Sequence, residues 1–155
     1  MKFFRSSIGF ELNELKKFES LEQKERQIVF YSENKNSLFI FESLIDELIN
    51  THNCNICYVT SSKDESILKN SNKKIKSFCI GEGVARTKFF LNLKADILIM
   101  TMPDLETFHI KRSKTYPVHY VYIFHAMLST SLAYRKKAFD NFDTIFSENV
   151  ISNYL

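Results

Sequence analysis

The chain has 155 residues, of which 45% are hydrophobic, 14% aromatic and 25% charged, and its formal net charge is +3. This length and balance predict one globular domain and exclude a disordered, collagen-like or low-complexity chain. Twenty-one basic residues against 18 acidic ones are too evenly balanced for a dedicated nucleic-acid-binding protein, so no nucleic-acid partner is expected.

Short apolar runs alternate with helical patterns along the chain. Residues 10–24 carry Leu12, Leu15 and Phe18 at helical spacing among many charges, which predicts an amphipathic helix within an N-terminal segment of residues 1–26. Runs rich in Ile, Val, Phe and Tyr predict strands at residues 27–31, 55–60, 75–80, 96–101, 120–124 and 144–146.

Two further helices are predicted between these strands. The first lies behind the cap-like Asn36-Ser37, because apolar residues recur there at helical spacing: Leu38, Phe41, Ile45 and Leu48. The second lies behind residues 81–83, with the same spacing of Ala85, Phe89 and Leu93. The resulting order, βαβαβαβ, predicts an α/β fold with a Rossmann-like, doubly wound and mostly parallel sheet, formed by residues 1–155 as a single domain.

The three cysteines are expected to be free thiols. Cys54 and Cys57 form a CxxC pair, but no second pair follows, and strand alternation directs the two side chains to opposite faces. Cys79 leaves the number odd, so neither a disulfide framework nor a zinc site is predicted.

His125 is the candidate catalytic residue. It follows the most apolar predicted strand, and ligands of parallel α/β sheets bind beyond the carboxyl ends of the strands. The ordinary pKa of an imidazole, near 6.5, suits a general base at cellular pH. The alternative is a structural histidine hydrogen-bonded to a loop carbonyl.

Polar and basic residues near the same edge are candidates for substrate binding. Two basic clusters follow strands there: Lys111, Arg112 and Lys114 after the fourth, and Arg135, Lys136 and Lys137 after the fifth. We assign phosphate recognition to Lys111, Arg112 and Arg135, and hydroxyl contacts to Ser129 and Thr130. The alternative is that both clusters are solvated surface charge.

The glycine pair at residues 81–83 resembles half of a dinucleotide-binding fingerprint. Arg86 stands where that motif requires its third glycine, so no dinucleotide cofactor is predicted. A tight strand-to-helix turn explains Gly81 and Gly83 equally well, and the helix that they open could face an anion.

Four phrases carry a family resemblance: GEGVAR at 81–86, KADILIMTMPDL at 94–105, HYVYIFH at 119–125 and YRKKAFDNFDTIF at 134–146. The stretch that they span resembles the CDP-glycerol:poly(glycerophosphate) glycerophosphotransferase family, enzymes of teichoic-acid and related polymer synthesis in cell wall or capsule. The sequence departs from the family at Ala126, where members commonly carry glycine or another small polar residue.

The resemblance implies the N-terminal, acceptor-side half of a GT-B-type transferase. His125 would deprotonate an acceptor hydroxyl for attack on the β-phosphorus of CDP-glycerol, releasing CMP, with no cofactor and no metal. The acceptor would be a lipid-linked glycan or polyol phosphate, and the enzyme would be cytoplasmic and peripheral at the inner face of the membrane.

The donor CDP-glycerol would bind a C-terminal half that this chain lacks and that is supplied in cis or in trans. The chain alone is therefore expected to be inactive. The alternative is a non-catalytic or truncated α/β module that serves packing or partner binding.

Overall fold

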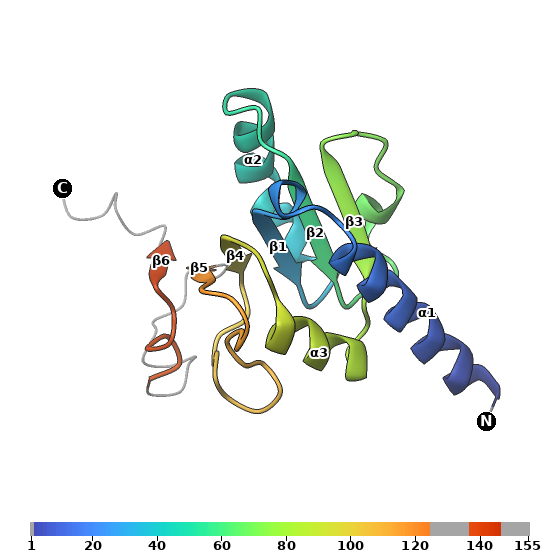
Figure 1. The fold of residues 1–155 in the computed structure, drawn as a ribbon. Coiled ribbons are helices and arrows are strands. Elements are labelled where there is room, and N and C mark those ends of the chain that lie inside the picture. Colours follow the sequence, from blue (N-terminus) through green and yellow to red (C-terminus); the bar gives the residue numbers. More distant parts are fainter. Residues whose placement is uncertain (1, 125–136, 147–155) are drawn as a thin grey trace.

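The computed structural model describes residues 2–124 and 137–146. The strands are β1 (Ile28–Ser32), β2 (Ile56–Thr60), β3 (Ile75–Cys79), β4 (Ile97–Met100), β5 (His119–Ile123) and β6 (Thr144–Phe146). They form one sheet in the order β3-β2-β1-β4-β5-β6, and every neighbouring pair is parallel (Figure 1). The order reverses between β1 and β4, as in Rossmann-like doubly wound folds.

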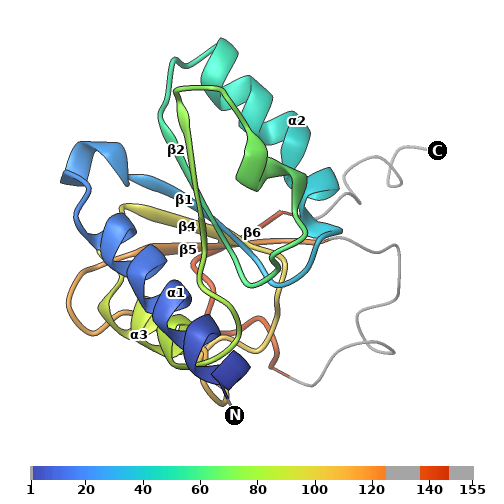
Figure 2. The same ribbon diagram turned by 90° about the vertical axis from the view of Figure 1, so that its right-hand side faces the viewer.

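Helices cover both faces of this sheet. They are α1 (Lys2–Glu19), α2 (Ser37–Asn50) and α3 (Val84–Asn92), with 3₁₀ turns η1 (Gln23–Glu25) and η2 (Ser66–Lys69). Helices α1 and α3 pack on one face, whereas α2 and η2 lie on the other (Figures 1 and 2). The predicted α/β, doubly wound parallel sheet is therefore confirmed.

Strand alternation divides the apolar side chains of β1 between the two faces. Val29 and Tyr31 belong to the core under α1 and α3, while Phe30 points to the other side. There the Phe30 ring meets Phe41 of α2, with ring centroids 5.2 Å apart. Because both faces are covered, each of these strand positions is apolar and fully buried.

Both predicted inter-strand helices are present as α2 and α3, but the regular βαβαβαβ order is not kept at two other connections. The link from β2 to β3 contains only the four-residue turn η2, and residues 101–118, between β4 and β5, contain no helix. Asp104, Glu106 and Phe108 have φ of 62°, 71° and 52°, respectively. A left-handed residue at every second position prevents the run of αR residues that a helix needs.

The N-terminal helix has different bounds from the predicted residues 10–24. It begins at Lys2, eight residues earlier, because Ser6, Ser7 and Gly9 are tolerated in a helix at modest cost. It ends at Glu19, before η1. Its residues Leu15 and Phe18 are buried against the sheet and α3. Among the described residues, no helix combines the length and apolar character that a membrane crossing requires.

The cysteines are free thiols, as predicted. Cys57 lies in the core under α1 and α3, whereas Cys54 packs against the core under α2, so the CxxC pair is divided between the two faces. The Cys57 thiol donates to the carbonyl of Glu25 at 3.2 Å, and burial raises its pKa to about 12.

Candidate functional site

The chain departs to opposite faces after β1 and β4. Strand β1 leads into α2 on one face, while residues 101–118, which follow β4, send Leu105 and Ile110 into the core on the other. The two strands are neighbours, with Ile28 paired to Ile97. This divergence opens a crevice beyond their carboxyl ends, where parallel α/β sheets bind ligands.

Two adjoining cavities occupy this crevice and share Glu33, Met102 and Pro103 in their walls. The larger, of about 380 Å³, lies against the start of α2 and is lined by the polar residues Glu33, Asn34, Asn36, Ser37 and Thr101. The smaller, of about 260 Å³, lies toward α3 and adds Arg86, Asp104, Thr107 and His109. Together the two cavities have room for a small polar ligand.

Arg86, in the first turn of α3, is the cation in the wall of the smaller cavity. Its side chain is only 15% exposed, and its guanidinium lies 3.9 Å from the carboxylate of Glu33, which directly follows β1. Burial raises the pKa of Tyr31 to about 12, although a hydrogen bond with Ser61, the charge of Arg86 and a hydrogen bond with the Arg86 side chain oppose the increase. The positive charge of Arg86 is therefore held at the end of β1.

A hydrogen-bond chain beneath the crevice fixes the turn that precedes α3. The hydroxyl of Ser61 donates to the carbonyl of Gly81 at 2.7 Å and is therefore left to accept the Tyr31 hydroxyl at 2.8 Å. Gly81 has φ of +62°, which favours glycine. Arg86 is thus presented from a turn that is tied to both β1 and the residue after β2.

A second buried network stiffens the ends of β1 and β2. One carboxylate oxygen of Glu65, a residue that is 3% exposed, accepts from the Ser32 hydroxyl at 2.7 Å and from the Tyr58 hydroxyl at 3.0 Å. Burial raises the pKa of Tyr58, so its hydroxyl stays a donor. The Ser32 hydroxyl also lies 2.7 Å from the backbone carbonyl of Asn34, and Asn34 lines the larger cavity.

Four of the predicted site residues, His125, Ser129, Thr130 and Arg135, lie outside the described residues. The described chain reaches Phe124, which follows β5 at the carboxyl edge of the sheet. There the Phe124 N–H donates to the carbonyl of Phe146 at the end of β6, at 3.0 Å.

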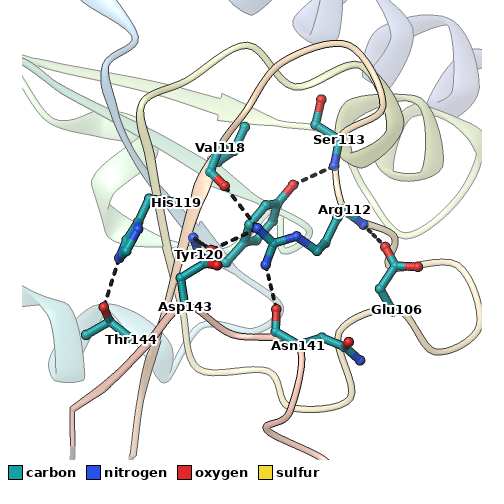
Figure 3. Close-up of polar contacts among 9 residues, drawn as sticks. All are labelled: Glu106, Arg112, Ser113, Val118, His119, Tyr120, Asn141, Asp143 and Thr144. Atoms are coloured by element: carbon teal, nitrogen blue, oxygen red, sulfur yellow. Dashed lines mark hydrogen bonds and ion pairs between the residues drawn. The ribbon is translucent and has the colours of Figure 1, made fainter.

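Arg112 lies at the other edge of the sheet, so its predicted place beyond the carboxyl ends is wrong. Its guanidinium donates to the carbonyls of Val118 at 3.3 Å and Asn141 at 2.7 Å, both at the amino-terminal ends of β5 and β6 (Figure 3). It also pairs with Asp143 at 2.9 Å and lies over the Tyr120 ring, 4.4 Å from its centroid. The long connection after β4 carries Arg112 back across the sheet, which strand order alone does not reveal.

Lys111 is held within the same connection, where its ammonium donates to the carbonyl of Glu106. As far as the described residues go, the structure therefore places neither Lys111 nor Arg112 in the walls of the two crevice cavities, where phosphate recognition was expected.

Sequence reasoning missed the residues that do line the crevice. Glu33 and Thr101 each come directly after a strand, β1 and β4, so the strand-end rule alone could have identified them. Arg86 was noted as a departure from a glycine motif and as part of the phrase GEGVAR, but not as a ligand-binding residue. The missing information was the strand order, which makes β1 and β4 neighbours.

No protein-family model, no curated protein and no solved structure matches the chain. The chemistry of the site therefore rests on its own residues. An arginine with low exposure, a nearby carboxylate and several amide and hydroxyl groups surround a cavity, which is a set suited to an anionic, hydroxyl-bearing ligand.

Proposed function

We propose that the chain is the acceptor-side half of a GT-B-type glycerophosphotransferase. In this proposal the crevice beyond β1 and β4 receives a lipid-linked or polyol-phosphate acceptor, and a C-terminal half, in cis or in trans, supplies CDP-glycerol. The observation that carries the proposal is the crevice with Arg86 in its wall, at the switch point of a Rossmann-like sheet. A Rossmann-like sheet serves many functions, and the family resemblance of residues 81–146 favours this transferase among them.

The proposed chemistry needs one base and one leaving group. His125 accepts the proton of an acceptor hydroxyl, whose oxygen then attacks the β-phosphorus of CDP-glycerol. The bond from that phosphorus to the bridging oxygen breaks, and CMP leaves with the bond's electron pair, so glycerol phosphate is joined to the acceptor through a new phosphodiester. Cationic groups at the cleft stabilise the charge on the transferring phosphate.

We further propose that the reaction takes place at the inner face of a membrane, because a lipid-linked acceptor is located there. Because Leu15 and Phe18 of α1 are buried in the core, the part of α1 through which the chain would approach that surface is the segment with the exposed Ile8 and Phe10.

Reconstitution with a separately supplied donor-binding half tests the proposed reaction. The measurement is transfer of labelled glycerol from CDP-glycerol to an acceptor that ends in glycerol phosphate. We expect transfer only when both halves are present, and a loss of about 100-fold or more in His125→Ala, which is typical of removing a general base. The matched control is His52→Ala. His52 is an exposed histidine that follows α2 and lies near Glu47, and the variant should retain the full rate of transfer.

Two results would contradict the proposal. Equal rates in His125→Ala and the unchanged chain would remove the base assignment. Absence of any transfer by the unchanged chain, despite a donor half that is active with another acceptor half, would favour a non-catalytic α/β module.

A further inference from the structure

We infer that Arg86 is a phosphate ligand of the crevice and that Glu33 is the counter-ion which the phosphate displaces. The assignment of an anion site to Arg86 stands on the geometry alone. The choice of a phosphate-bearing acceptor as its ligand rests on the proposed function.

The guanidinium of Arg86 is poorly satisfied for a group so little exposed. Its Nε is buried and has no hydrogen-bond partner in the described parts of the chain, residues 2–124 and 137–146. The 3.9 Å between its Nη1 and a carboxylate oxygen of Glu33 is too long for a hydrogen bond. The Arg86 side chain is hydrogen-bonded to the Tyr31 hydroxyl, but a guanidinium carries five N–H donors, so Arg86 retains unused donor capacity.

Arg112 provides the comparison within the same chain. Its guanidinium donates to two carbonyls and to the Asp143 carboxylate, and its face covers the Tyr120 ring. Such a side chain is occupied in holding the fold together. Arg86 is less exposed than Arg112, 15% against 33%, yet its partners are the Tyr31 hydroxyl and the Glu33 carboxylate 3.9 Å away, so these contacts offset only part of the cost of its burial.

A bound phosphate supplies what Arg86 lacks. Two phosphate oxygens accept a parallel pair of N–H bonds from one guanidinium, which is the strongest arrangement open to this side chain. Glu33 is 45% exposed and can turn to solvent once the anion arrives. The cavity of about 260 Å³ at Arg86 adjoins the larger one at Met102 and Pro103. A phosphate bound at Arg86 would therefore leave the alcohol part of the ligand room in the larger cavity.

The test observes the Arg86 side chain itself. Glycerol 3-phosphate is titrated into the ¹⁵N-labelled chain while the Arg86 Nε–H signal is followed by NMR, with glycerol as the neutral probe and CDP-glycerol as the donor probe. We expect glycerol 3-phosphate to shift this signal, glycerol to leave it in place, and CDP-glycerol to act no more strongly than glycerol 3-phosphate.

Substitutions then assign the effect. Arg86→Gln should weaken binding of glycerol 3-phosphate about 10-fold or more, and Arg86→Lys should do so less, because the charge remains but the paired donors are lost. Glu33→Gln should strengthen binding by removing the competing carboxylate. Lys88→Gln removes an exposed cation from the same helix and should change affinity by less than about twofold.

Each contrary result has a separate meaning. Equal affinities in Arg86→Gln and Lys88→Gln, with both variants folded by amide NMR spectra, overturn the assignment of Arg86. Transfer in the reconstituted reaction that is unaffected by Arg86→Gln overturns it as well, while leaving the proposed function intact. A shift caused by CDP-glycerol but not by glycerol 3-phosphate assigns the crevice to the donor and overturns both proposals.

Discussion

Gly81 shows how one backbone angle prepares the crevice. Its φ of +62° turns the chain from β3 toward α3, and its carbonyl accepts the Ser61 hydroxyl. A Cβ at this position would lie 2.4 Å from the carboxyl carbon of Glu11, on α1. Because a side-chain end can move aside, the backbone angle is the larger obstacle to any other residue.

Gly81→Ala should therefore lower the free energy of unfolding by about 1–2 kcal/mol, the cost of an L-residue in a left-handed conformation. The measurement is urea unfolding followed by circular dichroism. Gly9→Ala is the matched control, since Gly9 lies inside α1 with no atom near its missing Cβ. It should raise stability by about 0.5–1 kcal/mol, and a loss at Gly9 as large as that at Gly81 would contradict the explanation.

The Cys57 thiol makes stability depend on pH in the alkaline range. Burial raises its pKa from 9.0 to about 12, so between these values the unfolded chain loses the proton while the folded chain keeps it. The unfolded state then binds fewer protons, and the free energy of unfolding falls as pH rises, by up to about 1.4 kcal/mol per pH unit.

Cys57→Ala should remove this contribution, so the variant loses less stability than the unchanged chain between pH 9 and pH 12. Urea midpoints at each pH provide the measurement. Val59→Ala truncates a fully buried neighbour in the same core and carries no titrating group, so its deficit should stay constant with pH. A constant deficit in Cys57→Ala would show that the thiol is not the source.

At the level of elements, Arg112 joins the long connection after β4 to the last two strands. Its partners Val118, Asn141 and Asp143 lie just before β5 and β6, so one guanidinium fixes both strand starts (Figure 3). Asp143 also accepts the N–H of Tyr120 at 2.8 Å. Burial alone would raise the pKa of Asp143, but the Tyr120 N–H and the Arg112 guanidinium outweigh it and lower that pKa.

Arg112→Ala should lower the free energy of unfolding by about 2 kcal/mol, because charge-assisted hydrogen bonds are lost from a group that is one-third exposed. Combined with Asp143→Ala in a double-mutant cycle, it should show a coupling of about 1 kcal/mol. Lys114→Ala removes an exposed cation of the same connection and should cost no more than about 0.5 kcal/mol. Additive effects of Arg112 and Asp143 would argue against a structural pair.

In the whole molecule, one sheet separates two cores that share every central strand. Phe41 of α2 is fully buried on one face, and Phe89 of α3 is 1% exposed on the other. Since Val29 and Phe30 of β1 enter different cores, neither core can lose its packing without disturbing the same strand. The described fold is therefore expected to unfold as a unit.

Phe41→Ala and Phe89→Ala should each lower the free energy of unfolding by about 3–5 kcal/mol with an unchanged urea dependence. Far-ultraviolet circular dichroism and tyrosine fluorescence should give the same midpoint in each variant. Separate midpoints, or a Phe41 variant in which the α1 and α3 core retains its original midpoint, would show that the two faces unfold independently.

Local patterns were sufficient to predict the strands and the two helices that flank the crevice. Strand β4 is apolar at four consecutive positions because it is covered on both sides, and α2 carries Phe41 and Ile45 at the spacing of one buried face. These signals are local, because the apolar side chains of a strand or helix themselves show which of its faces is buried. The general order βαβαβαβ did not reveal that residues 101–118 contain no helix, although Pro103 and Pro117 are local signals against one.

The sequence by itself determined a doubly wound α/β domain and the thiol state of its cysteines, because periodicity and spacing encode which residues are buried. The tertiary structure alone decided that β1 and β4 are neighbours, that Glu33 and Arg86 face one crevice, and that Arg112 returns to the opposite edge. Those placements depend on the pairing of strands that lie up to 69 residues apart in the chain, as the register of Ile28 with Ile97 shows. Pairing over such separations is governed by how the whole sheet packs, and that information is not carried by any single segment.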